Sequence, residues 1–360
     1  MKKVNKSSHS NLIDLCKLLF TFSVVLMHFE SSYFTSPAKI FECGYLAVDF
    51  FFVLSGYLLY RSYKSGKYDN AMEFTKSRIK HFAPYVLTVI AMLTVYDLYG
   101  LVRDGVTLSA IVATEIQRIL YTISDALFLQ MFIPAQFVNF PMWYISVLLI
   151  VGMVYYMYLE RRTYVQTGEV LILSLIVLGA LKVIYGQLDV HIATTDIFYM
   201  PAGVLRGFAE MGIGLFCAEQ SEGIRHNSIK WSILEIIILI MMLVCMVKYP
   251  HTSLDFIFVI LCAAFIVLAF SDEYMNDRFN YLPKTVGVLS TNIYFCHMFC
   301  ISLWKYLMGP LNFITHGRES ISMMMIIILS CIVALLLEMF VNKIMKYVRM
   351  RNEKVINAGN

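Results

Sequence analysis

Charged residues are scarce in this sequence: only 15% of its 360 residues are Asp, Glu, Lys or Arg. A soluble domain carries roughly 25% charged and 45–50% apolar residues, whereas 59% of this chain is hydrophobic and its mean hydropathy is +0.68. This composition excludes a water-soluble core of this length. A bilayer span needs about 20 mostly apolar residues, and ten such stretches leave no room for a separate soluble domain.

Several other features are missing. All eight cysteines except Cys43 lie in apolar stretches without metal-ligand spacing, which indicates small buried hydrophobic residues and neither a disulfide framework nor a metal site. Basic patches interleaved with aromatic residues are absent, so we expect no nucleic-acid partner. The first apolar stretch contains Asp14 and Lys17 and lacks a small-x-small cleavage site, so it is expected to stay in the membrane.

The expected fold is all-α, a polytopic membrane bundle of about ten transmembrane helices, because backbone that faces lipid must form its hydrogen bonds within a helix. One transmembrane domain over 1–349 is expected, followed by a short, disordered cytoplasmic tail at 350–360. The predicted spans are roughly 12–29, 45–60, 82–100, 142–159, 169–186, 198–218, 229–247, 254–270, 285–308 and 320–344.

The distribution of Lys and Arg predicts the orientation. With the N-terminus inside, 20 of the 29 Lys and Arg residues fall in inner segments, 5 in outer segments and 4 within spans. The positive-inside rule then places both termini in the cytoplasm of a multi-pass plasma or inner membrane protein. An odd number of spans would disturb this alternation.

The long outer loop 101–141 contains a weaker apolar run at 119–133, which Asp125 and Gln130 interrupt. We interpret this run as a re-entrant or surface helix. The alternative is a miscounted span.

Three titratable residues lie in the first span. Asp14 and Lys17 are three residues apart and therefore neighbours on one helix face. Lys17 and His28 are eleven apart, and eleven steps of about 100° return nearly to the same face. A polar stripe across the membrane suits a transfer reaction; the alternative is a structural pair with an interfacial histidine.

The second span places Asp49 close to the expected depth of His28. We predict that the two side chains approach within hydrogen-bonding distance, directly or through one water, so that the carboxylate raises the basicity of the imidazole. Deeper in the span, Ser55 and Gly56 indicate close helix packing and not a nucleophile.

These spans resemble those of membrane-bound acyltransferase family 3, whose members O-acylate cell-surface glycans. The family opens with an acidic residue, then Arg, ten residues and His; here these are Asp14, Lys17 and His28. Lysine keeps the charge of the arginine but loses its bidentate fork. The stretch 48–56, Val-Asp-Phe-Phe-Phe-Val-Leu-Ser-Gly, is similar to the family's second-span signature.

A basic stretch at 78–85 resembles the family's Arg-x-x-Arg motif, with His81 at the second arginine position beside Lys80. Arg78, Lys80 and His81 at the inner mouth would suit the phosphates of coenzyme A. Ordinary positive-inside charge is the alternative.

Two later stretches complete the resemblance. The stretch 142–146 resembles the family's tryptophan motif, without the glutamate that some members carry, and 289–297 resembles its late Ser-x-x-x-Tyr-x-x-His pattern. The resemblance implies that Trp143, Tyr144 and His297 bind substrate; a belt aromatic and a packing histidine are the alternatives. Arg206 and Glu210 are four apart and favour a structural pair.

The resemblance implies an O-acyltransferase, most simply an O-acetyltransferase, without a tightly bound cofactor. Acyl-CoA would dock at the basic inner mouth, His28 oriented by Asp49 would act as general base, and Lys17 would stabilise negative charge. The acceptor would be a hydroxyl of a surface glycan or its lipid-linked precursor, in contact with membrane lipid. A polysaccharide exporter on the same scaffold is the alternative, and coenzyme A binding discriminates the two.

Overall fold

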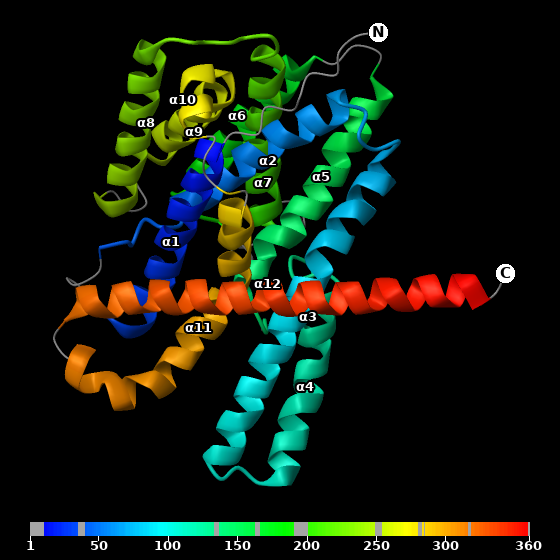
Figure 1. The fold of residues 1–360 in the computed structure, drawn as a ribbon. Coiled ribbons are helices and arrows are strands. Elements are labelled where there is room, and N and C mark those ends of the chain that lie inside the picture. Colours follow the sequence, from blue (N-terminus) through cyan, green and yellow to red (C-terminus); the bar gives the residue numbers. More distant parts are fainter. Residues whose placement is uncertain are drawn as a thin grey trace.

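The computed structural model describes residues 11–34, 40–132, 137–162, 166–190, 201–248, 254–279, 283, 285–315 and 318–358. Within these residues the elements are helices and no strand occurs, so the predicted all-α bundle is confirmed (Figure 1). The elements are α1 (Asn11–Tyr33), α2 (Leu46–Lys64), α3 (Ala71–Arg103), α4 (Leu108–Ala126), η1 (Phe140–Met142), α5 (Trp143–Arg161), α6 (Thr167–Tyr185), α7 (Ala202–Gln220), α8 (Ile229–Lys248), α9 (Leu254–Ser271), α10 (Glu273–Arg278), α11 (Thr285–Thr315) and α12 (Glu319–Ala358).

Each of the ten predicted spans overlaps a helix, but only seven helices among the described residues are long and apolar enough to cross a membrane. These are α1, α3, α5 together with η1, α6, α8, α11 and α12. α9 is apolar but shorter. α2 and α7 fall outside the seven because they carry Asp49, Arg206 and Glu210, which are buried inside the bundle and not presented to lipid.

α1 and α11 run side by side in the same direction. Oγ1 of Thr21 lies 2.9 Å from Oγ of Ser290, and seven residues further along each helix the rings of His28 and His297 stack with centroids 5.4 Å apart. Because the same spacing separates both contacts on each helix, the two helices are parallel. The first and ninth predicted spans therefore pack together.

α3 follows α11 in the same direction. Phe82 packs on Phe295 with ring centroids 6.0 Å apart, and further along both helices the Tyr96 hydroxyl donates to the carbonyl of Ser302 at 2.7 Å. Three odd-numbered spans of the prediction, α1, α3 and α11, are thus parallel to one another.

α2 runs against α1. Phe50 packs on Phe20 at 4.6 Å, whereas the earlier Gly44 lies beside the later Ser23. This direction agrees with the alternation expected of consecutive spans.

α2 packs very closely on α7. A Cβ at Gly56 would lie 1.9 Å from the carbonyl oxygen of Met211, and a Cβ at Gly214 would lie 1.9 Å from that of Val53. Small residues let helix backbones approach in this way, so the interpretation of Gly56 as a packing residue agrees with the structure.

α4 lies along the C-terminal part of α3, and the side chain of Arg118 joins Asp97 of α3 at 2.6 Å. Among its outward side chains, Val112, Ile116 and Leu120 are exposed. α4 does not meet the criteria for a span, which supports the interpretation as a surface helix. The end of the predicted run, at Ile133, lies outside the described residues.

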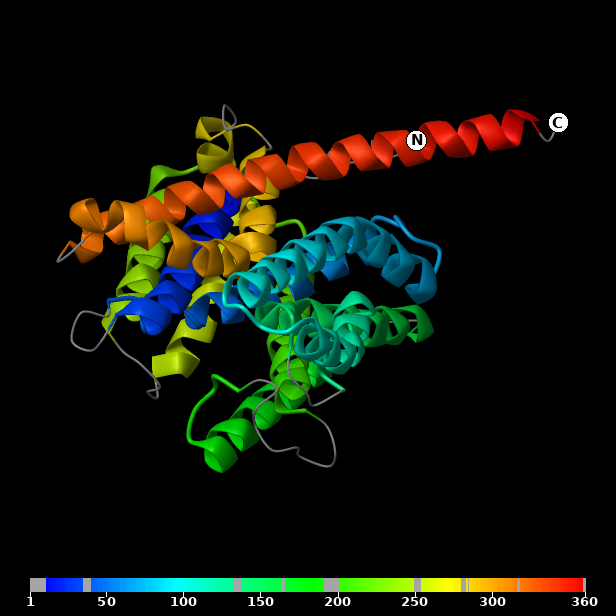
Figure 2. The ribbon, with the colours of Figure 1, turned by 90° about the horizontal axis from the view of Figure 1, so that it is seen from below.

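α12 lies across one side of the bundle and packs on α11, α1 and α3, while its C-terminal end projects beyond the other helices (Figures 1 and 2). The helix continues to Ala358, so the expectation of a disordered tail is wrong for residues 350–358. Residues 359–360 lie outside the described part.

Candidate active site

Asp49 belongs to a charge cluster with the equally buried Arg206 and Glu210 and the partly buried Asp189. Nε of Arg206 lies 3.1 Å from Oδ1 of Asp49 and 3.1 Å from Oε1 of Glu210, and its Nη1 lies 3.1 Å from Asp189. The predicted Arg206–Glu210 pair is therefore confirmed. A carboxylate buried in a low-dielectric interior needs a cation in contact, and Arg206 provides it.

The prediction that Asp49 orients His28 is wrong. Oδ1 of Asp49 binds Arg206, and its Oδ2 has no hydrogen-bond partner among the described residues. Phe51, two residues after Asp49, lines a cavity on the opposite side of α2. Two residues turn a helix by about 200°, so Asp49 faces α7 instead. Asp49 also differs from His28 in level, because the next residue, Phe50, packs on Phe20, eight residues before His28 in α1.

His28 instead lies against His297. The two rings are nearly parallel, with an interplanar angle of 27°. His297 is fully buried, and its Nδ1 lies 2.7 Å from the carbonyl oxygen of Tyr294, so Nδ1 carries a hydrogen and Nε2 is the acceptor in the neutral ring. That Nε2 has no hydrogen-bond partner among the described residues, whereas His28 is half-buried. The two histidines form a pair, although the sequence motifs pointed to each of them only on its own.

Lys17 joins Asp14 at 3.1 Å, as their spacing predicts. Both line a cavity of about 340 Å³, together with His81 of α3 and Glu338 of α12. Glu338 accepts hydrogen bonds there from the hydroxyl of Tyr85 at 2.9 Å and from the amide of Asn292 at 2.7 Å.

A second cavity of about 250 Å³ shares Lys17 and His81 with the first and extends deeper into the bundle. Arg78 lines it as well, with its guanidinium 5.4 Å from the ring of Phe74. The remaining lining comes from five helices: Thr21, Phe51, Leu54, Ser55, Leu58, Phe82, Tyr144, Ile145, Leu148, Ser290, Thr291 and Tyr294. The structure thus brings four of the expected residues, Lys17, Arg78, His81 and Tyr144, to one cavity.

Lys80 and Trp143 do not line this cavity. Arg78 and His81 are three residues apart and share a helix face, whereas Lys80 points elsewhere and is exposed. Trp143 is buried and packs on Phe52, with ring centroids 6.1 Å apart. Trp143 is therefore not brought to the cavity with Tyr144, and it is not an exposed belt aromatic.

Tyr294 separates the second cavity from the histidine pair. Its ring lines the cavity and lies 5.8 Å from the ring of His297, which in turn stacks on His28. The hydroxyl of Tyr294 donates to the carbonyl of Pro141. Going inward from the basic residues, one therefore meets first the cavity, then Tyr294, then His297 and finally His28.

A buried polar cluster lies beside α11, where α4 ends and η1 begins. Oδ2 of Asp125 accepts from the backbone N–H groups of Val138 and Asn139, and the Asn139 amide donates to the carbonyl of Phe295. Gln130 is fully buried beside them. Sequence reasoning treated Asp125 and Gln130 only as interruptions of an apolar run, and the signal it missed is that such interruptions mark side chains turned inward.

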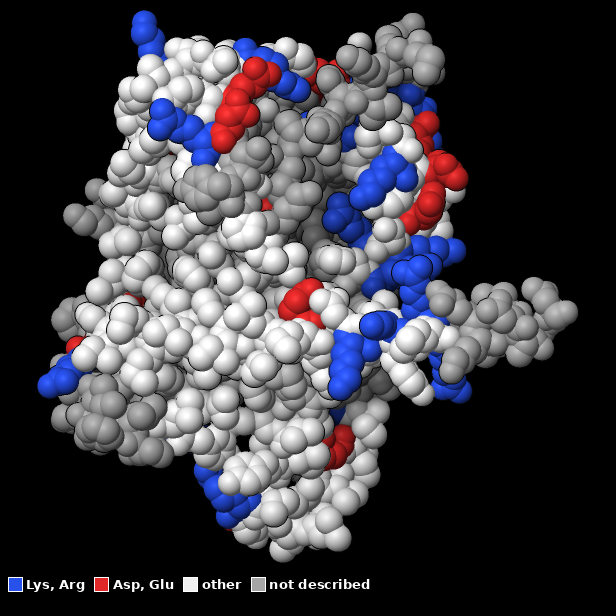
Figure 3. Space-filling view, viewed as in Figure 1, with Lys and Arg blue, Asp and Glu red and all other residues white. Residues whose placement is uncertain are grey.

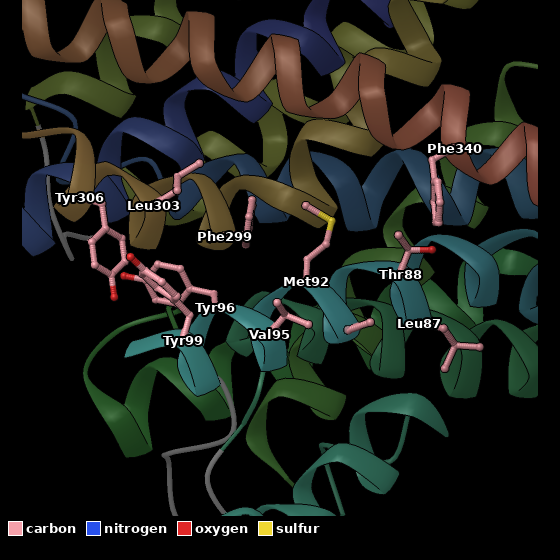
Figure 4. A pocket seen from close by; sticks show the side chains of 11 residues that line it. Leu87, Thr88, Met92, Val95, Tyr96, Tyr99, Phe299, Leu303, Tyr306 and Phe340 are labelled. Atoms are coloured by element: carbon pink, nitrogen blue, oxygen red, sulfur yellow. The ribbon is translucent and has the colours of Figure 1, made fainter. Parts of the chain in front are cut away.

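An apolar groove of about 820 Å³ lies between α3, α11 and α12. Figure 4 shows Tyr96, Tyr99 and Tyr306 gathered at one end of it, with Leu87 and Phe340 at the other. None of the expected catalytic residues lines it. Its walls are apolar side chains of three membrane-crossing helices, so it suits hydrocarbon and not a polar substrate.

Comparison with known proteins agrees with the resemblance noted in the sequence. Residues 11–342 match the family model described as an acyltransferase domain, that of acyltransferase family 3. Protein 2 in the picA locus of Rhizobium radiobacter is 28% identical over 187 residues, which is 46% of this chain and 91% of that protein. No solved structure matches significantly. Because the family model extends from the start of α1 into α12, the chain belongs to acyltransferase family 3 and is a multi-pass membrane acyltransferase.

Proposed function

We propose that this protein transfers an acetyl group from cytoplasmic acetyl-CoA to a hydroxyl of a cell-surface glycan or of its lipid-linked precursor. The observation that carries the proposal is the second cavity. It has Lys17, Arg78 and His81 at one end, and a histidine pair lies behind its other end. Family membership favours transfer over the exporter alternative.

The basic end suits the phosphates of coenzyme A. Arginine binds phosphate through paired, charge-assisted hydrogen bonds, and Lys17 adds a compact positive charge. The C-terminal half of α12 exposes Lys343, Lys346 and Arg349, and Figure 3 shows Lys and Arg gathered on the side of the molecule where this helix and the first turns of α3 lie. Such a surface attracts a polyanionic donor.

The middle of the cavity suits the pantetheine arm. Leu54 and Leu148 give it apolar walls, while the hydroxyls of Ser55 and Thr291 offer hydrogen bonds to amide groups. The thioester would then point toward Tyr294 and the histidines.

His28 is the proposed proton acceptor, because it is half-buried and therefore within reach of an acceptor molecule. It takes the proton of the acceptor hydroxyl as the oxygen attacks the thioester carbonyl. The new C–O bond forms, the C–S bond breaks, and the departing thiolate receives the proton. His297 stacks on His28 and positions its ring. Asp49 has no part in this step, since it pairs with Arg206.

Donor binding provides the first test, in which the exposed Lys80 is a matched control on the same helix turn. In detergent-purified protein, Arg78→Ala should weaken acetyl-CoA binding at least about tenfold, because a lost charge-assisted contact costs about 1.5–3 kcal/mol. Lys80→Ala should leave the affinity within about twofold. Isothermal titration at low and high salt measures both. Equal affinities for both variants and the wild type would contradict a donor site in this cavity.

A second experiment addresses the acceptor. Mass spectrometry of surface glycans from cells with and without the protein should show acetyl esters only when it is present. Loss of these esters in cells carrying Arg78→Ala would link the modification to the donor cavity. Identical glycans in both strains would contradict the proposed acceptor class.

A further inference from the structure

The second cavity has two chemically different ends. Because α1, α3 and α11 are parallel and α2 runs against them, the order of lining residues along the helices gives the ends. Lys17, Arg78 and Leu58 lie at one end, and Thr21 and Phe51 lie toward the other. The charged residues thus gather at one end and the aromatic ones at the opposite end.

Three aromatic side chains close that second end, and we call Phe51, Tyr144 and Tyr294 the aromatic cap. The ring of Tyr144 lies 6.3 Å from that of Phe51 and 5.7 Å from that of Tyr294. The planes of both pairs are steeply inclined, at 61° and 69°, which is the edge-to-face arrangement that aromatic rings prefer. One of the three rings, that of Tyr294, lies between the cavity and His297.

Hydrogen bonds hold two of the three cap rings in place. The hydroxyl of Tyr144 lies 3.1 Å from Oγ of Ser55, and the hydroxyl of Tyr294 donates to the carbonyl of Pro141. Both tyrosines are buried, whereas Phe51 is half-buried and has no polar group. Displacing either tyrosine leaves a buried polar group unpaired, which is costly. Phe51 is the ring that can be removed with least damage.

We infer that the aromatic cap sets the upper length of the acyl chain that the protein accepts. The inference rests on the proposed function, because it requires the thioester of an acyl-CoA in this cavity. The carbonyl must lie near Tyr294 and the histidines to react, so the acyl chain occupies what space remains beneath Phe51 and Tyr144. A methyl group fits there without moving a ring, whereas each further methylene presses on the anchored wall.

The test compares acyl-CoA chains of two, four and eight carbons in membranes that contain the native acceptor, with release of the coenzyme A thiol as the readout. The wild type should prefer acetyl-CoA over butyryl-CoA, because a close-packed pocket discriminates about 10–200-fold per misfit methylene. Phe51→Ala should raise the butyryl-to-acetyl ratio of kcat/KM about tenfold or more. Tyr144→Ala should extend the range further.

Tyr155→Phe is the matched control: it removes the hydroxyl of another buried tyrosine of α5, one that donates to the carbonyl of Phe208 and lies outside the cavity. Its length profile should equal that of the wild type. If Tyr144→Ala does not fold, Phe51→Ala alone decides, and acetyl-CoA turnover shows that it is folded. An unchanged butyryl-to-acetyl ratio in a Phe51→Ala protein that still uses acetyl-CoA would overturn the inference that the cap limits the acyl chain. Wild-type protein that uses octanoyl-CoA as well as acetyl-CoA would overturn it too. Both outcomes leave the proposed function standing. A wild type that uses no acyl-CoA would overturn the proposed function itself.

Discussion

Asp49 and His28, on the neighbouring helices α2 and α1, serve different ends. Asp49 is fully buried and bound by Arg206, so it stabilises the contact of α2 with α7. His28 is half-buried beside His297 and remains reachable. Full burial and a bound arginine make Asp49 a structural carboxylate, whereas the partial exposure of His28 leaves its imidazole available for chemistry.

The first prediction concerns these two residues. His28→Ala should lower turnover about 100-fold or more, as expected for loss of a general base, with acetyl-CoA affinity and protein abundance unchanged. Asp49→Asn should lower the melting temperature and abundance but preserve turnover per folded molecule, since it weakens only the pair with Arg206. Turnover assays on purified variants, normalised to monodisperse protein, measure both effects. Wild-type turnover of folded His28→Ala would exclude the catalytic role.

The second prediction concerns Asp125, which lies in α4 outside the helices that can cross the membrane. Burial raises its pKa from the ordinary value of 3.8 to about 6, against the opposing effect of the N–H groups of Asn139 and Val138. The folded state therefore binds a proton more tightly than the unfolded state. The stability that protonated Asp125 contributes is fully present below pH 3.8 and is lost as pH rises through about 6.

Asp125→Asn removes this titration and keeps the hydrogen-bond acceptor. The melting temperature of the variant, relative to the wild type, should therefore be higher at pH 7.5 than at pH 4.5. The pKa difference corresponds to about 3 kcal/mol at most. Thermal unfolding of both proteins in detergent across this range gives the difference, and a pH-independent difference would contradict the prediction.

At the scale of elements, helix periodicity predicted two ion pairs within single helices correctly. Asp14 pairs with Lys17, and Arg206 with Glu210, as their spacing predicts. Of the expected basic site, only Arg78 and His81 line the cavity, because Lys80 lies on another face of the helix.

Contacts between helices were not predictable in this way, because a sequence gives the depth of a span but not its rotation about its own axis. Rotation turns Asp49 toward Arg206, and the register of α2 on α1 sets Phe50 against Phe20, so neither brings Asp49 to His28. The stacking of His28 on His297 and the aromatic cap likewise appear only in the structure. The basic end of the cavity was predictable because loop charges accumulate at a known boundary.

The third prediction concerns the contact of α2 with α7. Gly56→Ala should destabilise the protein by about 1–3 kcal/mol, as overpacking of a close contact does, because the new Cβ would meet the backbone of Met211. Gly179→Ala in α6 is the matched control, since a Cβ there meets open space. It should be neutral or slightly stabilising, because alanine favours a helix over glycine by about 1 kcal/mol. Melting temperatures of the two variants that fall equally would argue against a close contact.

At the scale of the whole molecule, the parallel course of α1, α3 and α11 agrees with their places as the first, third and ninth predicted spans, which are separated by odd numbers of spans. The orientation in the membrane remains a prediction from the 20-to-5 distribution of Lys and Arg. α12 is the element least like its prediction, since it lies across the bundle and continues as a helix to Ala358.

The fourth prediction is therefore topological. Reporter fusions between α2 and α3 and at the C-terminus should both report a cytoplasmic location, and a fusion at Gly105, between α3 and α4, should report the outside. Paired fluorescent-protein and alkaline-phosphatase fusions distinguish the two compartments. An external signal at the C-terminus alone would mean that α12 does not cross the membrane.

The pairing of α1 with α11 has a consequence for how the protein is made. Thr21 and Ser290, which touch across these helices, are 269 residues apart in the chain. At roughly 5–20 residues per second, a ribosome takes on the order of ten to fifty seconds to synthesise the intervening segment. Throughout that time α1 lies in the membrane without α11, the helix that carries His297. A nascent chain therefore holds only half of the histidine pair, and the catalytic machinery stays incomplete until translation is almost finished.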